Sequence, residues 1–270
     1  MTSSRARIRC RRLTALAVLA GLITAGCGTS QDGSSSRDSD DTRSTSSAPA
    51  VIDPGDGGHY QPTIDPANFG DVIDNPYMPW KAGSRWLYEG AEGNEKQRVE
   101  VAVKPERRMI MGVNTVSVQD EVFHAGSRDP IEITTDWYAQ DKAGNVWYFG
   151  EDTKEYENGK VSSTKGTWTA GVKGALPGII MLASPQVGKA YRQEYAPGEA
   201  EDTAQVVRTD ASVTVKAGRY DKVVVTKEWT PLEPKVVEEK SYAPTVGFVF
   251  KRQAAGGTGQ LELVTFTPGG

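Results

Sequence analysis

The sequence has few of the residues that build metal sites and disulfides, with 2 Cys and 2 His among 270 residues. Those four side chains cannot assemble a zinc-finger type of site, so we expect no metal. Nowhere do about 18 apolar residues follow one another, which excludes an ordinary transmembrane helix. The 35 acidic residues outnumber the 31 basic ones and no basic patch stands out, so we expect no nucleic-acid partner.

Motifs of enzyme active sites are also scarce. The phosphate-loop, dinucleotide, zinc-protease, nucleophile-elbow and C-x-x-C patterns are missing, and we expect no cofactor and no catalytic residue. Residues 162–165 read S-x-x-K, a nucleophile pattern of penicillin-binding proteins, but its partner motifs are missing. A catalytic triad would depend on His124, which has no partner in the local sequence. The sequence therefore predicts a protein that is not an enzyme.

The first residues predict export. Residues 5–12 hold five arginines and no acid, and an apolar run follows over residues 13–25, as in a secretory signal. The next residues complete Ile23-Thr24-Ala25-Gly26-Cys27, which resembles the bacterial lipobox, although Leu is commoner than Thr at position 24. The resemblance implies a signal peptide over residues 1–26, and diacylglyceryl and acyl groups on Cys27 that anchor the protein outside the cytoplasm. The alternatives are plain secretion with an incidental Cys27, and twin-arginine rather than general export through Arg11 and Arg12.

A polar segment follows the lipidated cysteine. Ser, Thr, Asp and Gly fill 22 of the 31 positions from residue 28 to residue 58, and none is aromatic. Such a composition cannot bury enough apolar surface to offset its ordering entropy, so we expect residues 27–59 to form a disordered tether. As a flexible coil it would span about 30 Å on average. Without the signal the chain carries 31 − 5 = 26 basic and 35 acidic residues, a net charge of −9.

Residues 60–270 predict one β-rich domain. From residue 69 onward there are 24 Val and 6 Leu, an excess typical of strands. Val99, Val101 and Val103 alternate with other residues, which is the period of a half-buried strand. Turn signals such as Asn158-Gly159 recur every 8–12 residues. We therefore predict an all-β fold with a single antiparallel curved sheet, a half-barrel or a sandwich.

An aromatic hairpin over residues 136–152 is the first candidate site. Trp147 and Phe149 fall on one face of a strand and Tyr148 on the other, which is typical of a strand covered on both sides. The alternative is a stacking platform for a sugar ring or an apolar ligand, with Trp137, Tyr138, Trp147 and Phe149 as its contacts. The acids at the hairpin ends, among them Asp136, Asp141, Glu151 and Asp152, predict a solvated end rather than a calcium site, because their spacing does not fit a calcium loop.

The second candidate is the apolar stretch over residues 174–185. Its two prolines and two glycines predict an irregular segment rather than a strand. We expect it to plug one end of the sheet. The alternatives are the lip of an apolar cavity, with Ile179 and Met181 as ligand contacts, and a patch that faces the membrane or a partner.

The last third of the chain resembles a group of exported bacterial β-rich proteins, some of them lipoproteins. The likeness covers about residues 205–265 and rests on V-x-V-x-A-G-x-Y at residues 213–220, on Tyr242-Ala243-Pro244-Thr245-Val246-Gly247 and on Glu262-Leu263. It implies a curved antiparallel sheet, which in some relatives is an open half-barrel that holds lipid. It implies turns at Gly218 and Gly247 and no catalytic residue.

Three functions remain open. We expect foremost a membrane-anchored, extracytoplasmic binding or carrier module for an apolar or envelope ligand. The second candidate is an interaction protein that contacts another envelope protein. The third is a hydrolase of cell-wall polymer, which would need a cleft with two suitably spaced carboxylates.

Overall fold

The computed structural model describes residues 59–270, and the predicted signal peptide, Cys27 and nearly all of the predicted tether lie outside that range. The described residues form a sheet whose neighbouring strands are all antiparallel, plus one turn of 3₁₀ helix, as the all-β prediction required. The elements are η1 (Pro66–Asn68), β1 (Phe69–Gly70), β2 (Arg85–Glu92), β3 (Glu95–Ile110), β4 (Val113–His124), β5 (Pro130–Asp141), β6 (Val146–Glu157), β7 (Lys160–Ser163), β8 (Trp168–Thr169), β9 (Leu176–Met181), β10 (Ala190–Arg192), β11 (Glu194–Tyr195), β12 (Thr203–Val215), β13 (Gly218–Trp229), β14 (Val237–Ala243), β15 (Gly247–Ala255) and β16 (Gly259–Thr267). Within residues 59–270 no helix is long and apolar enough to cross a membrane.

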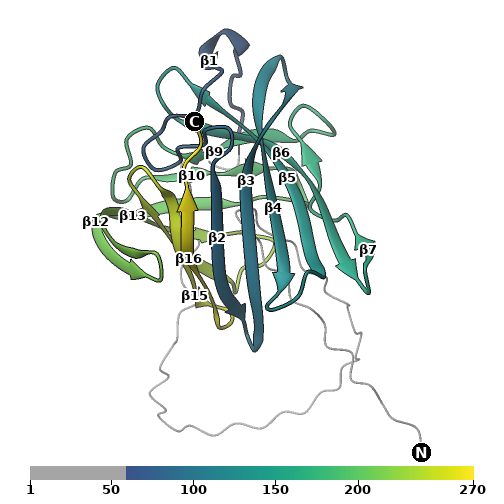
Figure 1. Ribbon diagram of the computed structural model, residues 1–270. Helices are drawn as coiled ribbons and strands as arrows, with labels where there is room; N and C mark the ends of the chain where they lie inside the picture. The colour runs from purple at the N-terminus through teal and green to yellow at the C-terminus, as the bar shows by residue number, and fades with distance from the viewer. Residues whose placement is uncertain (1–58) are drawn as a thin grey trace, which may run out of the picture.

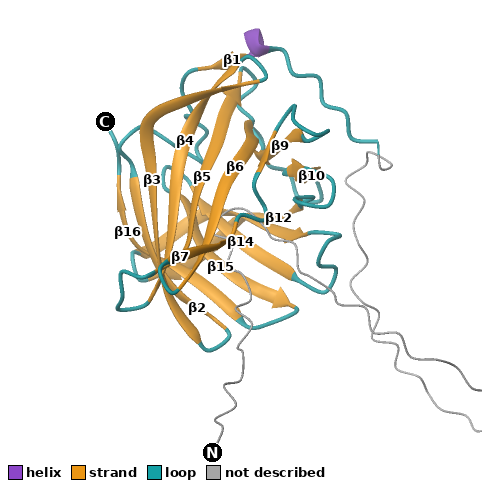
Figure 2. Cartoon of the chain, turned by 90° about the vertical axis from the view of Figure 1, so that its right-hand side faces the viewer, coloured by secondary structure: helices purple, strands orange, loops and turns teal. Residues whose placement is uncertain are grey.

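The sheet curves until its two ends almost meet. Its order is β10-β12-β13-β14-β15-β16-β2-β3-β4-β5-β6-β9-β11. β10 pairs with β12 at one end and β11 pairs with β9 at the other, and only Gln193 separates β10 from β11. The sheet is therefore nearly closed into a barrel. Figure 1 shows β2 to β6 upright in front, with β12 and β13 crossing behind them at a steep angle, and Figure 2 shows β14 and β15 crossing β3 to β6 in the same way.

The alternation in the sequence sets which side chains point inward. Val99, Val101 and Val103 on β3 are 1–3% exposed, as their spacing predicted. The turn predictions are also confirmed, because Asn158 and Gly159 join β6 to β7 with φ of 52° and 71°. Gly218 and Gly247 both have the positive φ that the resemblance implied.

The prediction that residues 174–185 are irregular was wrong, since Leu176–Met181 forms β9. The two breaker residues lie where this strand changes partner. Pro177 pairs with β11, whereas Gly178 begins the pairing with β6. A side chain on Gly178 would collide with the backbone of Gln193, so the glycine permits that close approach.

The segment between β1 and β2 closes one end of the barrel in place of the predicted plug. Its Ile73, Met78 and Trp80 are 1%, 1% and 5% exposed. The Asn75 side chain donates to the carbonyl oxygens of Gly144 and Leu182, at 2.9 and 3.1 Å. These bonds fix the segment across the ends of β5, β6 and β9, so that Trp80 points into the interior.

Candidate functional site: an acidic barrel interior

The concave side of the sheet carries an unusual number of buried carboxyl groups, which we call the interior acids. They are Asp120, Glu132, Asp136, Glu151, Glu194, Asp202 and Glu228, and none is more than 5% exposed. Charged side chains are rarely buried to this degree without paired charges. The barrel interior is therefore the main candidate for a functional site.

The strand register brings three of the interior acids, Asp120, Asp136 and Glu151, onto one face. Asp120 on β4 lies opposite Thr134 on β5, which lies opposite Thr153 on β6. Asp136 on β5 lies opposite Glu151 on β6. This pair is two residues along each strand from the threonine pair, so its side chains point to the same face. Side chains of directly opposed and diagonal residues in a sheet lie within reach of one another. The acids thus surround a pair of threonine hydroxyl groups 3.1 Å apart.

Neutral donors stabilise some of these carboxyl groups. The Tyr148 hydroxyl donates to Asp136 at 2.6 Å, and the Thr153 hydroxyl donates to Glu151 at 3.0 Å. The Trp168 indole N–H donates to Glu194 at 3.0 Å. Asp120 differs, because neither of its carboxylate oxygens has a hydrogen-bond partner among residues 59–270 although it is only 1% exposed. Leaving a buried polar atom unsatisfied costs about 1–3 kcal/mol, and more for a charged one.

Four aromatic rings form a row of contacts from the closed end of the barrel toward the acids; the middle pair is stacked and the outer two contacts are edge to face. The ring centroids of Trp80 and Tyr138 are 4.0 Å apart. Those of Tyr138 and Tyr148 are 4.6 Å apart, and those of Tyr148 and Trp168 are 5.3 Å apart. We call this row the aromatic ladder. Its far members donate to Asp136 and Glu194, so apolar and acidic surfaces adjoin inside the barrel.

Two lysines neutralise only part of the interior charge. Lys240 on β14 is 2.8 Å from Glu228, and the two side chains are 2% and 1% exposed. Lys251 on β15 is 2.9 Å from Glu238, which also lies 3.8 Å from Lys240. Burial alone would raise the pKa of Glu238, but Lys251 and Lys240 hold that pKa below its ordinary value. Among the other interior acids, burial raises the pKa of Asp120 and Asp202 by more than Lys251 and Lys240, respectively, lower it.

Burial determines how those other acids titrate. It raises the pKa of Asp120 and Glu151 well above the ordinary values, and nearby Asp136 raises both further. Burial raises the pKa of Asp136 to about 7, against a hydrogen bond from Tyr148 that lowers it. Burial also raises the pKa of Asp202 to about 7 and, with Asp202 as a neighbour, raises the pKa of Glu194. Near neutral pH the interior can therefore take up protons or a cationic group.

The structure does not gather the predicted ligand contacts on one surface. Trp137 points outward, and the guanidinium carbon of Arg108 lies 3.9 Å from its ring centroid. Trp147 and Phe149 also lie on the outer face, where both rings contact Phe69 edge to face. These three side chains are parts of the outer packing of β5 and β6.

The other predicted contacts lie elsewhere. Tyr138 is fully buried in the aromatic ladder. Met181 belongs to the main core, whereas Ile179 packs against a small cluster that contains Tyr191 and Val206. Of the six residues, Tyr138 alone adjoins the interior acids, through its contact with Tyr148.

The prediction of a solvated acidic hairpin end was wrong for three of its members. Asp136 and Glu151 are buried in the interior. Asp141 is 6% exposed and fixes the turn between β5 and β6, because it accepts bonds from the Asn145 amide groups and the Trp147 indole N–H. Only Asp152 remains partly exposed, in an ion pair with Lys154. No group of metal-binding side chains is present within the described residues.

The two residues singled out for nucleophilic chemistry lie in separate settings. The Ser162 hydroxyl donates to the carbonyl oxygen of Glu155 at 3.3 Å. His124 Nδ1 lies 2.7 Å from Glu95 Oε1. Neither contact pairs a hydroxyl with a base.

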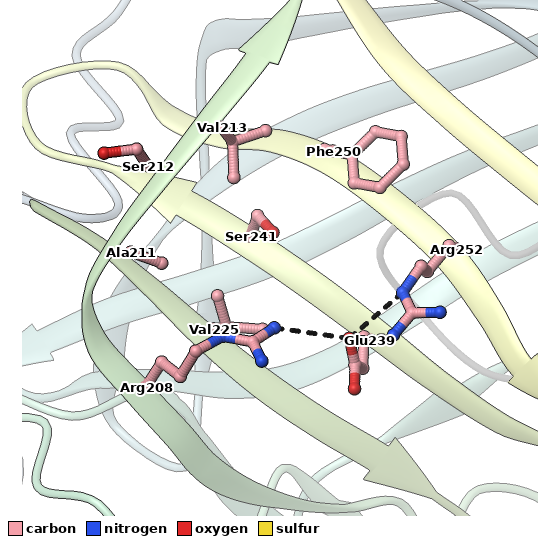
Figure 3. A pocket seen from close by; sticks show the side chains of 9 residues that line it. All are labelled: Arg208, Ala211, Ser212, Val213, Val225, Glu239, Ser241, Phe250 and Arg252. Atoms are coloured by element: carbon pink, nitrogen blue, oxygen red, sulfur yellow. Dashed lines mark hydrogen bonds and ion pairs between the residues drawn. The ribbon is translucent and has the colours of Figure 1, made fainter. Parts of the chain in front are cut away.

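A shallow hollow on the outer surface of the sheet is the second candidate site. It has a volume of about 400 Å³ and is lined by β12 to β15. Glu239 lies between Arg208 and Arg252, at 3.5 and 2.7 Å, with Val225 and Phe250 beside them (Figure 3). The ion pairs are largely exposed, so they contribute little binding energy by themselves.

The comparisons with known proteins do not assign a family. No family model matches the chain, and no curated protein matches it. Among solved structures, a Bacteroides fragilis protein described as exported, with a YmcC-like fold, has a TM-score of 0.43 and 15% identity, over 71% of this chain and 99% of that one. A Parabacteroides distasonis protein described as a lipoprotein has a TM-score of 0.39 and 12% identity, over 73% of this chain and 100% of that one.

Proposed function

We propose that this protein is a membrane-anchored, non-catalytic binding module that works outside the cytoplasm. The signal and lipobox pattern that ends at Cys27 supports the anchor, and 59 − 27 = 32 residue steps separate that cysteine from the first described residue. The nearly closed sheet with its acidic interior supports a binding role. Cys27 itself lies outside the described residues, so the anchor needs its own test.

Acylation of Cys27 is the first prediction. Cells that express the wild-type chain are expected to incorporate labelled palmitate into it, and a Cys27→Ala variant is expected to incorporate none, because the acyl chains attach through the maturation of that cysteine. Gel fluorography of the immunoprecipitated proteins measures this. Equal labelling of the two proteins, or no labelling of the wild type, would contradict the anchor.

We further infer that the ligand is a small organic cation with an apolar part. The single observation that supports this most strongly is Asp120, a buried carboxyl group with no hydrogen-bond partner among the described residues. Burial and neighbouring acids raise the pKa of Asp120, and they outweigh the charge of Lys251, which lowers it. An ammonium group beside it would relieve the cost of burying the carboxylate, since opposite charges attract strongly where the dielectric constant is low. The aromatic ladder would contact the apolar part of the same ligand. The sequence analysis expected an apolar ligand, and this proposal adds a cationic group to it.

A matched pair of probes tests this ligand class. Isothermal titration calorimetry at pH 8 is expected to show that the full chain binds 1,8-diaminooctane but not 1,8-octanediol, which has the same length and no charge. Asp120→Asn is expected to weaken diamine binding at least tenfold, about 1.4 kcal/mol or more. Asp152→Asn is the control, because that acid neighbours Glu151 on β6 yet is partly exposed.

Three results would overturn the assignment. They are equal binding of the diol, no binding of the diamine by the wild type, and undiminished binding by Asp120→Asn. Circular dichroism of both variants shows whether each remains folded.

The outer hollow supports a second candidate, contact with another envelope protein. Its charged rim of Arg208, Glu239 and Arg252 over apolar Val225 and Phe250 has the composition of a protein-binding surface. Cross-linking in intact membranes tests it. A partner recovered with the wild type and lost with Phe250→Asp would favour this role.

A further inference from the structure

One end of the barrel bears an exposed apolar surface, which we call the apolar tip. It consists of Val72, Met109, Met111 and Val172, with exposed fractions of 60%, 65%, 40% and 52%. They belong to a group of six exposed large apolar side chains in the described residues, and the other two are Val161 and Val187. The gathering of four at one end is unlike a scatter of single exposed residues, which needs no explanation.

Contacts show that three chain segments build the tip. The Met111 side chain lies next to Gly171, 3.1 Å from where a Cβ on that glycine would stand, so it adjoins the turn that holds Val172. Asn114 lies opposite Met109 in the register of β3 and β4, and its amide donates to Asp71, the neighbour of Val72, at 3.0 Å. The three segments therefore lie side by side around the β3–β4 turn.

The β3–β4 turn carries its methionine against local preference. Met111 and Gly112 have φ of 49° and 79°. The equivalent β6–β7 turn has φ of 52° and 71° and uses Asn158 and Gly159, the pair that such turns favour. A methionine at the left-handed position adds strain and also exposes apolar surface to water. Neither property helps the chain to fold, which points to a role in binding.

We propose that the apolar tip inserts shallowly into the surface of the lipid bilayer to which Cys27 is anchored. This inference rests on the proposed anchor. The chain reaches this end soon after it enters the described domain. The Tyr60 hydroxyl donates to the carbonyl oxygen of Pro177 on β9 at 2.8 Å, and six residues later Pro66 of η1 packs against Gly112 in the β3–β4 turn. Figure 2 shows η1 beside β1 at that end. The 32 residue steps from Cys27 to residue 59 would span about 110 Å if fully extended, and about 30 Å as the coil that their composition predicts. The anchor would therefore hold the domain within that distance of the bilayer.

Such a tether makes a weak contact effective. It turns binding of the tip into an intramolecular event with an effective concentration near the millimolar range. The local charge also permits approach, because exposed Arg107, Arg108 and Lys173 offset Asp71 and Glu106. A lipid surface therefore suits this end of the domain.

A fluorescent probe at the tip tests the proposal. The acylated chain has no free thiol, so Met111→Cys can be labelled alone with a nitrobenzoxadiazole group, and Val161→Cys serves as control. Val161 is 50% exposed, and its strand β7 lies far from the β3–β4 turn in Figure 1. In phosphatidylcholine vesicles that contain doxyl-labelled lipid, we expect at least twofold quenching and a blue shift at position 111, and neither at position 161.

The outcomes separate the two proposals. If the protein floats with the vesicles and both probes remain unquenched, the apolar tip is not a lipid contact, whereas the anchor stands. If the protein does not float, the anchor fails and this inference fails with it. Met111→Asn, which should relieve the strained turn, is expected to raise the unfolding midpoint in solution while it abolishes the quenching of a probe at position 109.

Discussion

Replacing Lys240 with methionine is expected to lower the free energy of unfolding by about 3–5 kcal/mol, the largest effect we expect from one substitution. Lys240 and Glu228 form an ion pair of 2.8 Å in which neither side chain is more than 2% exposed. Removal of the lysine leaves Glu228 buried among other acids without its cation. Burial alone would lower the pKa of Lys240, but Glu228 and Glu238 raise it, so the lysine is charged throughout the accessible pH range. Urea unfolding at pH 7 measures the loss.

An exposed ion pair provides the control. Lys154 and Asp152 are 2.6 Å apart, but their side chains are 40% and 45% exposed. Lys154→Met is expected to cost less than about 1 kcal/mol, because solvent screens such pairs. Losses of similar size for the two substitutions would mean that the interior is more hydrated than its burial indicates.

Stability is expected to decrease as the pH rises from 5 to 8. Burial raises the pKa of Asp136 and Asp202 to about 7 in the folded protein, well above their unfolded values near 3.8. A group with a raised pKa stabilises the fold fully below its unfolded pKa, and this contribution disappears as the pH passes through the folded pKa. A tenfold difference in proton affinity between the folded and unfolded chain is worth about 1.4 kcal/mol, so the two groups together should remove on the order of 3–5 kcal/mol over this range.

Groups with a lowered pKa oppose this loss of stability only below about pH 5. Glu238, whose pKa Lys251 and Lys240 lower despite its burial, contributes stability that is lost only as the pH falls through its own range. Urea midpoints between pH 5 and pH 8 measure the profile, and the Asp136→Asn/Asp202→Asn double variant should give a flatter one. A wild-type profile that is flat, or that rises toward pH 8, would show that these carboxyl groups are not protonated in the folded state.

The fold could be predicted because its signals are local. Valines at every second position and turn pairs such as Asn158-Gly159 specify antiparallel strands through contacts within a few residues. The structural features that the sequence did not predict depend on contacts between residues far apart in the chain. Pro177 and Gly178 are typical strand breakers, yet β9 accommodates them where its partner changes from β11 to β6. The role of Trp80 at the closed end depends on Tyr138, nearly 60 residues away, and no local pattern encodes that contact.

The candidate site was missed for a related reason. Asp120 occupies the same alternating phase as Val116, Val118 and Val122, and an acid in the apolar phase of a strand was a detectable signal. The sequence also pointed to Asp136 and Glu151, but it placed them in solvent because they flank a hairpin and their spacing does not fit a calcium loop. Whether an inward carboxyl group is solvated depends on closure of the barrel through β10 and β11. Local patterning cannot show that closure.

The most direct test of the central claim is native mass spectrometry of the full chain, released gently from the membranes of the cells that made it. A binding module for a small organic cation is expected to carry a non-covalent adduct beyond the mass of its lipid groups. That adduct should be absent from Asp120→Asn and retained by Asp152→Asn. The bare lipidated mass for all three proteins, or an adduct that survives in Asp120→Asn, would contradict a ligand site in the acidic interior.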